Sequence, residues 1–213
     1  MSISTYGDIL RQVKMWANRS DLTDEQYNSF IFFSGNIANQ LLRVPAMEST
    51  LILDVTPDGH VSIPFDFLEL RSMTYAWGTS DSQPLSRLAW DQFVTYYNSP
   101  NSIDTGIKYF SRQGPFWFLS AKPEAGSKIT VHYYRAMPDI NSTEQVNWLS
   151  KLSPMTYIFG ALHYLYMFVQ EEERAAYWKN LFNEELGRIQ MLGDNSEYKG
   201  SSLAVRSRNL LGE

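Results

Sequence analysis

The hydrophobic and polar positions of the chain follow a helical period near both ends and the alternation of strands in between. Ile9, Val13 and Trp16 recur at intervals of three and four residues, with Leu10 beside them. This spacing predicts an amphipathic helix over residues 5–18, because it matches the period of an α-helix. The polar residues that follow it predict a short loop.

A second helix is predicted over residues 24–42. The run Asp21-Leu22-Thr23-Asp24 offers short oxygen side chains that can cap orphan backbone N–H groups, and Pro45 lacks the N–H that would continue the helix. We expect this helix to lie antiparallel to the first. The apolar stripe expected on it comprises Tyr27, Phe30, Phe33, Ile37, Leu41 and Leu42.

The middle of the chain, about residues 47–140, has the residue types and turns of strands. Residues 50–55 and 60–64 flank the strong turn signal Pro57-Asp58-Gly59, which predicts a hairpin over residues 51–64. Short turns between consecutive strands favour an antiparallel sheet or small barrel. The remaining elements expected here are strands over 70–77, 107–111, 115–120 and 127–135, and a short helix over 86–98.

The last part of the chain again predicts helices. Pro154 fits the first turn of a helix capped by Ser153 and running to about residue 169. After the polar break at residues 170–173, a further helix is expected to reach about residue 191 and to end at Gly193-Asp194-Asn195.

These elements predict an α+β fold. We expect an antiparallel helical bundle formed by residues 1–45 and 146–195, with a β-rich domain of residues 46–145 inserted into it. The N-terminal helix pair alone would bury too little surface to be stable, which favours an insertion over a linear array of two domains. Residues 196–213 are polar, and we expect them to form a flexible C-terminal tail.

Composition narrows the possible functions. A net charge of −5 argues against a nucleic-acid binder that works through bulk positive charge. The absence of cysteine excludes disulfides, thiolate zinc sites and iron–sulfur clusters. No run of 18 apolar residues and no secretory pattern at the start are present, so we expect a soluble intracellular protein.

Few residues suggest catalysis. His60, His132 and His163 stand in no metal-ligand spacing, and no phosphate-binding glycine loop or nucleophile elbow occurs. We expect no cofactor, no metal and no catalytic residue, with His163 as a hydrogen-bonded core histidine. The run Glu171-Glu172-Glu173 is interpreted as the solvated start of the last helix, where negative charge meets the helix dipole favourably.

One carboxylate pair supports an alternative. Asp66 and Glu69, near aromatic residues, could act together in hydrolysis of a cell-wall glycan. The structural interpretation is that Asp66 caps a turn after Pro64 and that Glu69 pairs with Arg71. We favour the structural interpretation and keep the glycan-degrading, tail-associated enzyme as an alternative.

Aromatic residues make up 15% of the chain and often stand in adjacent pairs on predicted strands. Adjacent strand residues face opposite sides, so both faces of the sheet should carry large rings. We interpret the outer rings as contacts with a neighbouring subunit. Carbohydrate stacking and binding of single-stranded nucleic acid are the alternatives. The candidate subunit-contact residues are Tyr109, Phe116, Phe118 and Tyr134.

Several short stretches, in order from about residue 6 to 190, resemble the head-to-tail adaptor (connector) proteins of tailed bacteriophages, chiefly short-tailed ones. The stretches are Tyr6-Gly7-Asp8-Ile9-Leu10, Asn18-Arg19-Ser20-Asp21-Leu22, Asn39-Gln40-Leu41-Leu42-Arg43-Val44 with Met47-Glu48, Ile63-Pro64-Phe65-Asp66-Phe67-Leu68-Glu69-Leu70-Arg71, Tyr133-Tyr134-Arg135-Ala136-Met137-Pro138, Asn147-Trp148-Leu149 and Tyr157-Ile158-Phe159-Gly160-Ala161-Leu162.

The resemblance implies a structural virion protein without catalytic residues, assembled in the host bacterial cytoplasm. Such adaptors form a ring, commonly of twelve copies, beneath the portal protein. The ring extends the DNA channel, and DNA contacts it only while passing through during ejection. It is also a platform for downstream tail or nozzle proteins. No membrane partner is implied. In related adaptors the C-terminal segment reaches the portal. The expected portal-docking residues are therefore Lys199, Leu203, Arg206, Arg208, Leu210 and Leu211.

Overall fold

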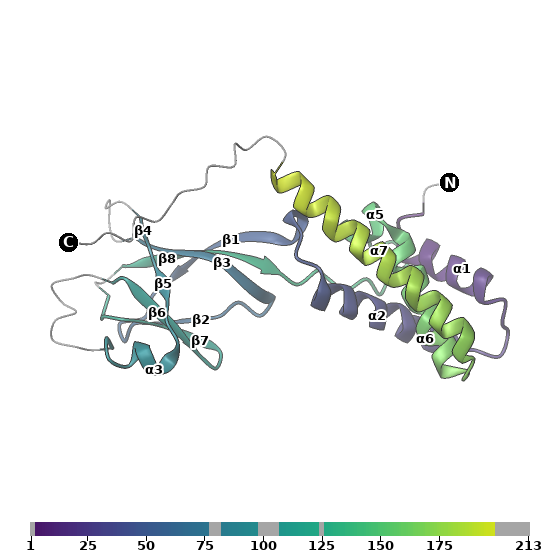
Figure 1. Ribbon diagram of the computed structural model, residues 1–213, viewed down its shortest axis with the longest axis horizontal. Coiled ribbons are helices and arrows are strands. Elements are labelled where there is room, and N and C mark those ends of the chain that lie inside the picture. Colours follow the sequence, from purple (N-terminus) through teal and green to yellow (C-terminus); the bar gives the residue numbers. More distant parts are fainter. Residues whose placement is uncertain (1–2, 77–81, 98–106, 124–125, 199–213) are drawn as a thin grey trace. The chain divides into compact units, whose positions relative to one another are not determined.

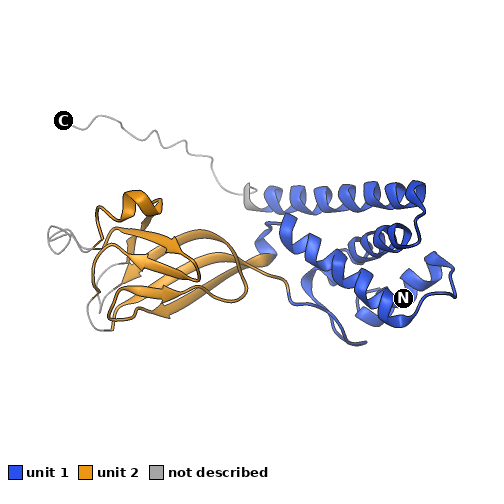
Figure 2. Ribbon diagram, turned by 90° about the horizontal axis from the view of Figure 1, so that it is seen from below, with its two compact units in different colours: residues 1–46, 138–213 blue, residues 47–137 orange. Residues whose placement is uncertain are grey.

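The protein has the predicted α+β fold, with helices near both ends of the chain and a β-rich region between them (Figure 1). The computed structural model describes residues 3–76, 82–97, 107–123 and 126–198. The chain divides into two compact units (Figure 2). The helical unit comprises Met1–Ala46 and Pro138–Glu213, and the β unit comprises Met47–Met137.

The helical unit contains five α-helices among its described residues. They are α1 (Tyr6–Ala17), α2 (Asp24–Leu41), α5 (Trp148–Leu152), α6 (Pro154–Phe168) and α7 (Glu172–Tyr198). A short 3₁₀ turn, Pro45–Met47, follows α2. Local signals set the starts of the first two helices. Thr5 caps α1, and at α2 the Thr23 side chain accepts from the Gln26 N–H while the Gln26 side chain accepts from the Thr23 N–H, a capping box.

Helix α6 is the centre of this unit, packing against α1, α2, α5 and α7. Its buried side chains include Tyr157, Ile158, Leu162 and Leu165, and residues 154–170 contain no Asp, Glu, Lys or Arg. The α2–α6 crossing is close, since a Cβ atom at Gly160 would lie only 2.7 Å from the Ser34 Cβ. A helix without charge and buried on several sides is typical of a core helix.

The buried stripe of α2 differs from the predicted one. Tyr27, Phe30 and Leu42 are buried as expected, but Phe33 is 42% and Leu41 60% exposed. The small residues of α2, among them Ser34 and Ala38, face α6 instead, because the close crossing leaves no room for large side chains.

Two further expectations about the helices are corrected by the structure. Ser153 is the N-cap residue of α6, as predicted, but its Oγ donates to the Glu185 carboxylate of α7 and makes no capping hydrogen bond. Helix α7 does not end at Gly193 but continues to Tyr198. Gly193 serves close packing, since a Cβ there would lie 2.7 Å from the Val44 Cγ1.

The β unit contains two four-stranded sheets. One has the order β1 (Glu48–Asp54), β8 (Lys128–Arg135), β3 (Phe67–Ala76) and β4 (Gln83–Pro84). The other has the order β2 (His60–Ser62), β7 (Phe116–Leu119), β6 (Tyr109–Gln113) and β5 (Ser86–Arg87). All the pairings are antiparallel except that of β5 with β6.

The predicted hairpin over residues 51–64 does not form. The turn is present, with Gly59 at φ 78° and the Thr56 N–H donating to the His60 carbonyl at 3.1 Å. However, β1 pairs with β8 over seven residues, whereas β2 pairs with β7 in the other sheet. The turn therefore passes the chain from one sheet to the other.

The expected helix over residues 86–98 is also mostly absent. Ser86–Arg87 pairs with β6 as strand β5, and the helix α3 is limited to Trp90–Phe93.

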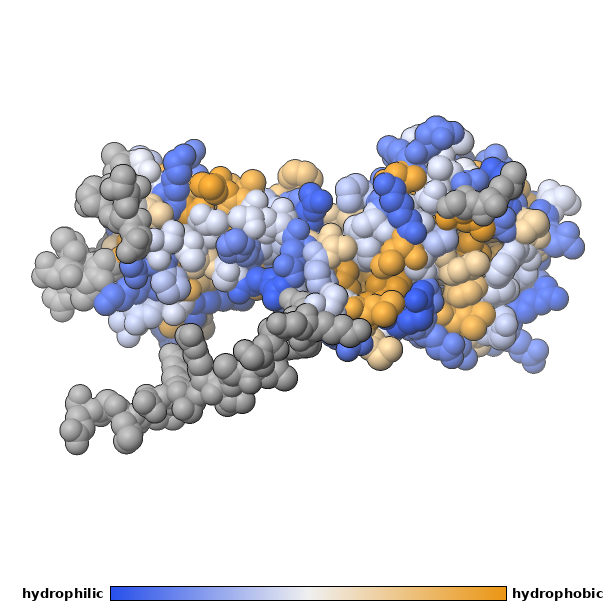
Figure 3. All heavy atoms as spheres, turned by 90° about the horizontal axis from the view of Figure 1, so that it is seen from above, coloured by the Kyte–Doolittle hydropathy of each residue, from blue (hydrophilic) through white to orange (hydrophobic). Residues whose placement is uncertain are grey.

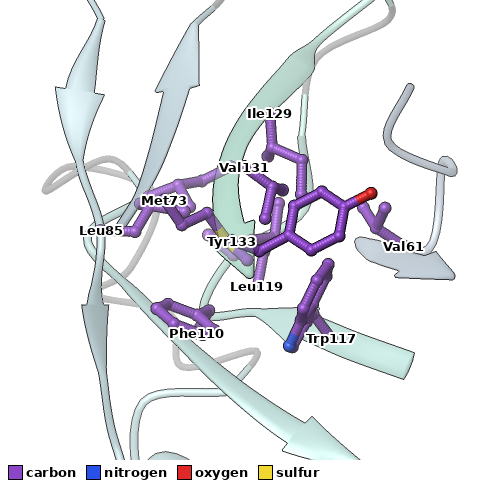
Figure 4. Packing of buried hydrophobic residues seen from close by; sticks show 11 residues of the cluster. Val61, Met73, Leu85, Phe110, Trp117, Leu119, Ile129, Val131 and Tyr133 are labelled. Atoms are coloured by element: carbon purple, nitrogen blue, oxygen red, sulfur yellow. The ribbon is translucent and has the colours of Figure 1, made fainter. Parts of the chain in front are cut away.

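Side chains from both sheets meet in one buried cluster (Figure 4). Trp117 and Leu119 of β7 face Val131 and Tyr133 of β8, and Phe67 packs on the Trp117 ring at a centroid distance of 5.2 Å. The β unit is therefore a sandwich with its own hydrophobic core.

Candidate assembly surfaces

Three of the four predicted subunit-contact residues lie on the outer face of the sheet β2-β7-β6-β5. Because Trp117, Leu119 and Phe110 point into the core, Phe116, Phe118 and Tyr109 point outward, and all three are half-buried. The strand alternation that the sequence predicted, with rings on both faces, is confirmed.

The chain itself covers part of this outer face. The Phe118 ring lies 5.7 Å from the ring of Trp90 on α3 and 6.2 Å from that of Tyr97, while Tyr109 packs on Tyr96 at 4.9 Å. Phe116 contacts His60 edge-on at 5.3 Å. In these ring pairs, Phe118 and Tyr109 contact residues 90–97, whereas Phe116 contacts His60.

The fourth residue, Tyr134, lies on the other sheet. Its neighbour Tyr133 is buried in the core, so Tyr134 points outward, where the Arg71 guanidinium lies 5.5 Å from its ring centroid. Arg71 also forms an ion pair with Glu48. Tyr134 therefore does not share a surface with Tyr109, Phe116 and Phe118.

The other predicted set, the portal-docking residues Lys199, Leu203, Arg206, Arg208, Leu210 and Leu211, lies outside the described residues.

The Asp66–Glu69 pair does not form a catalytic cleft in the described structure. The Asp66 carboxylate accepts from the Tyr133 hydroxyl at 3.0 Å, and the Asp66 carbonyl accepts from the Ala136 N–H at 2.6 Å. Burial and this hydrogen bond raise the pKa of Tyr133. Glu69 lines a cavity of about 180 Å³ that Asp66 does not line, and ligand pockets usually exceed about 300 Å³. Asp66 thus holds the loop between β2 and β3 in place.

That loop presents Phe65 to solvent, fully exposed at 103% of its reference area. The hydrogen bonds of Asp66, together with the one from the Phe67 N–H to the Pro64 carbonyl at 3.1 Å, fix the backbone on both sides of it. An exposed ring on a fixed loop loses little entropy on binding, which suits a contact residue.

Two further titratable features noted in the sequence are structural. His163 is 9% exposed, and its Nδ1 lies 2.9 Å from the Ala175 carbonyl, as predicted for a core histidine. Burial lowers the pKa of this imidazole. Glu172 and Glu173 are exposed in the first turn of α7, as predicted for the acidic run, whereas Glu171 pairs with Arg19 and Arg174. Within the described ranges, no group of three or more His, Asp or Glu residues could hold a metal ion.

Two aromatic surfaces of the helical unit were not singled out from the sequence. We call the first the α2–α6 patch; it consists of Phe32, Phe33, Tyr164 and Phe168. Phe33 meets Tyr164 at 5.5 Å, and Phe168 packs over the buried Phe30 at 5.8 Å. The sequence signal for it is the absence of any charged residue from 26 to 42 and from 154 to 170.

We call the second the α1–α7 patch; it consists of Met15, Trp16, Phe159, Tyr177 and Trp178. The rings of Trp16, Phe159 and Trp178 are mutually 5.7–6.2 Å apart, and Met15 and Tyr177 are 61% and 59% exposed. Figure 3 shows how hydrophobic side chains of the helical unit gather into patches among polar ones. Apolar patches of this kind mark interaction surfaces.

In the part of the chain that is described, no helix has the length and apolar character needed to cross a membrane.

The family described as SU10 adaptor protein matches residues 4–206, nearly the whole chain and both compact units. A search of curated proteins finds no match.

Proposed function

The chain belongs to the SU10 adaptor protein family and is a phage head-to-tail adaptor, a structural component of the virion, and from this premise we propose that it forms a closed ring of twelve copies beneath the portal of a short-tailed phage. The ring extends the DNA channel from the portal, and its far side receives the next tail or nozzle proteins.

The family match over residues 4–206 is the main support for this proposal, because it covers both compact units rather than a single short motif. The surfaces of the described residues support it. Exposed rings occur on the helical unit and on the Phe65 loop, and half-buried rings lie on the outer faces of both sheets. Since apolar side chains on several separate surfaces require several partners, they suit a subunit that contacts neighbours, portal and tail at once.

The charge of the chain supports a passive channel. A net charge of −5 gives weak attraction to DNA phosphates, so DNA can slide through without being arrested. A structural adaptor needs no cleft, and the described residues offer the Asp66–Glu69 pair no shared one.

We assign portal docking to residues 199–213, which contain Arg206 and Arg208 beside apolar residues such as Leu210 and Leu211. A short segment of mixed basic and apolar residues can fold on contact with another protein.

Co-sedimentation with portal rings tests the proposal. The full chain should sediment with the portal, and a chain ending at Tyr198 should remain folded but stay in the supernatant. Equal sedimentation of both would contradict the docking role of residues 199–213. Failure of the full chain to sediment would contradict the adaptor–portal contact itself.

A further inference from the structure

The two aromatic patches of the helical unit lie on opposite sides of its central helix. Phe159 of the α1–α7 patch and Phe168 of the α2–α6 patch are nine residues apart in α6. At 3.6 residues per turn, that separation is about two and a half turns, so the two side chains leave the helix in opposite directions. Besides α6, the α2–α6 patch includes side chains of α2, and the α1–α7 patch includes side chains of α1 and α7.

The α2–α6 patch has the composition of an interface centre. Residues 26–42 and 154–170 include no Asp, Glu, Lys or Arg, whereas α7 has nine such residues among its 27. His163 is the one residue of α6 that can take up a positive charge, and it is buried with a lowered pKa. Covering this surface therefore removes no charge from water, and the depletion of charge is what distinguishes the centre of an interface from its rim.

The size of the patch also suits a partner protein. Phe168 and the two adjacent phenylalanines are each about half exposed. With roughly 200 Å² for a fully exposed large side chain, the patch presents about 300 Å² of apolar surface. That is more than a third of the roughly 800 Å² that one partner contributes to a standard interface. The α1–α7 patch is of similar character and has Arg174, ion-paired with Glu171, one turn before Trp178 as a polar rim.

We propose that the α2–α6 patch of one copy packs against the α1–α7 patch of the next copy. This inference rests on the ring proposed above. Two different apolar surfaces on opposite sides of one subunit make a heterologous contact, which repeats from copy to copy and closes into a ring at a suitable angle. A single self-complementary patch would instead stop at a dimer.

The absence of cysteine makes the contact directly testable. Phe32→Cys on α2 and Tyr177→Cys on α7 replace side chains that are 45% and 59% exposed, so neither removes a core group. A chain carrying both is assembled on portal rings and treated with a short bismaleimide. We expect a ladder of covalent multimers beyond the dimer, because each copy then links to a neighbour on both sides.

The matched control carries Phe32→Cys with Lys179→Cys. Lys179 is exposed and lies two residues after Tyr177, on the other side of α7, so this chain should give no ladder. Incorporation into portal-bound rings is measured first. Loss of incorporation with Tyr177→Cys but not with Lys179→Cys would also support the contact, since only the former alters the patch.

Other outcomes overturn the inference. Dimers from Phe32→Cys alone would mean that the α2–α6 patch packs on its own copy. Rings that form but give no ladder would show that the helical patches do not meet, and would leave the proposed function intact. Unsubstituted chains that fail to form rings on the portal would overturn the proposed ring, and this contact with it.

Discussion

Gly160 provides the sharpest test of the packing between α2 and α6. A Cβ atom added there would lie 2.7 Å from the Ser34 Cβ and 3.0 Å from the Phe182 Cε2. Carbon atoms prefer separations of about 3.5–4.0 Å. Ser34 is fully buried and its Oγ donates to the Phe30 carbonyl at 2.8 Å, so its Cβ can move only if the α2 backbone moves.

The sign of the effect follows from two opposed contributions. Replacing glycine by alanine in an unobstructed helix interior stabilises the helix by about 1 kcal/mol. Overpacking a tight core site costs about 1–3 kcal/mol. At 2.7 Å from a backbone-anchored carbon, we expect the steric cost to exceed the gain, so Gly160→Ala should lower the free energy of unfolding by up to about 2 kcal/mol.

Gly187 provides the matched control. It lies within α7, and an added Cβ would meet no atom within 4 Å. Gly187→Ala should therefore raise the free energy of unfolding by about 1 kcal/mol. Both variants are measured by urea unfolding followed by helical circular dichroism, which reports chiefly on the helical unit. Stabilisation of similar size in both would refute the close α2–α6 crossing.

Three further predictions concern single residues of the helical unit. Thr23→Ala removes the capping box of α2 and should cost about 1 kcal/mol, seen as a lower urea midpoint. Burial raises the pKa of Tyr157 to about 12 from 10.0, so the unfolded chain loses this proton first as pH rises. The free energy of unfolding should therefore fall by roughly 2–3 kcal/mol between pH 10 and 12. In Tyr157→Phe, the free energy of unfolding should depend less on pH over that range. Burial lowers the pKa of His163 below 6.5, so the unfolded chain takes up the proton first as pH falls. The urea midpoint of the protein should therefore decrease as pH drops below 6.5. The midpoint of His163→Gln, which lacks this titrating group, should depend less on pH in that range.

Features set by nearby residues could be predicted from the sequence. The starts of α1 and α2 depend on Thr5 and Thr23, whose side chains cap N–H groups three residues away. The alternation of Phe116, Trp117 and Phe118 followed from the geometry of one strand.

Features set by residues far away along the chain could not be predicted from the sequence. Pro57-Asp58-Gly59 makes the turn it predicts, but nothing in it indicates that β1 pairs with β8, about eighty residues away along the chain. Gly193 was interpreted as a helix end because glycine often is one, whereas its role is close contact with Val44.

The aromatic patches show the same limit. Helical spacing placed Phe33 and Leu41 in the buried stripe of α2, because a periodic pattern shows which residues share a face and not what covers that face. The absence of charge over residues 26–42 and 154–170 is the sequence signal that marks these helices. For α6 it reflects burial in the core, whereas only the structure shows that Phe33 and Leu41 of α2 are exposed.

Electron cryo-microscopy of portal rings incubated with this chain tests the central claim most directly. The account predicts added density for a closed ring of copies, twelve in number, stacked coaxially on the portal around an open channel. Portal particles without added density, or with isolated copies that do not touch one another, would contradict it.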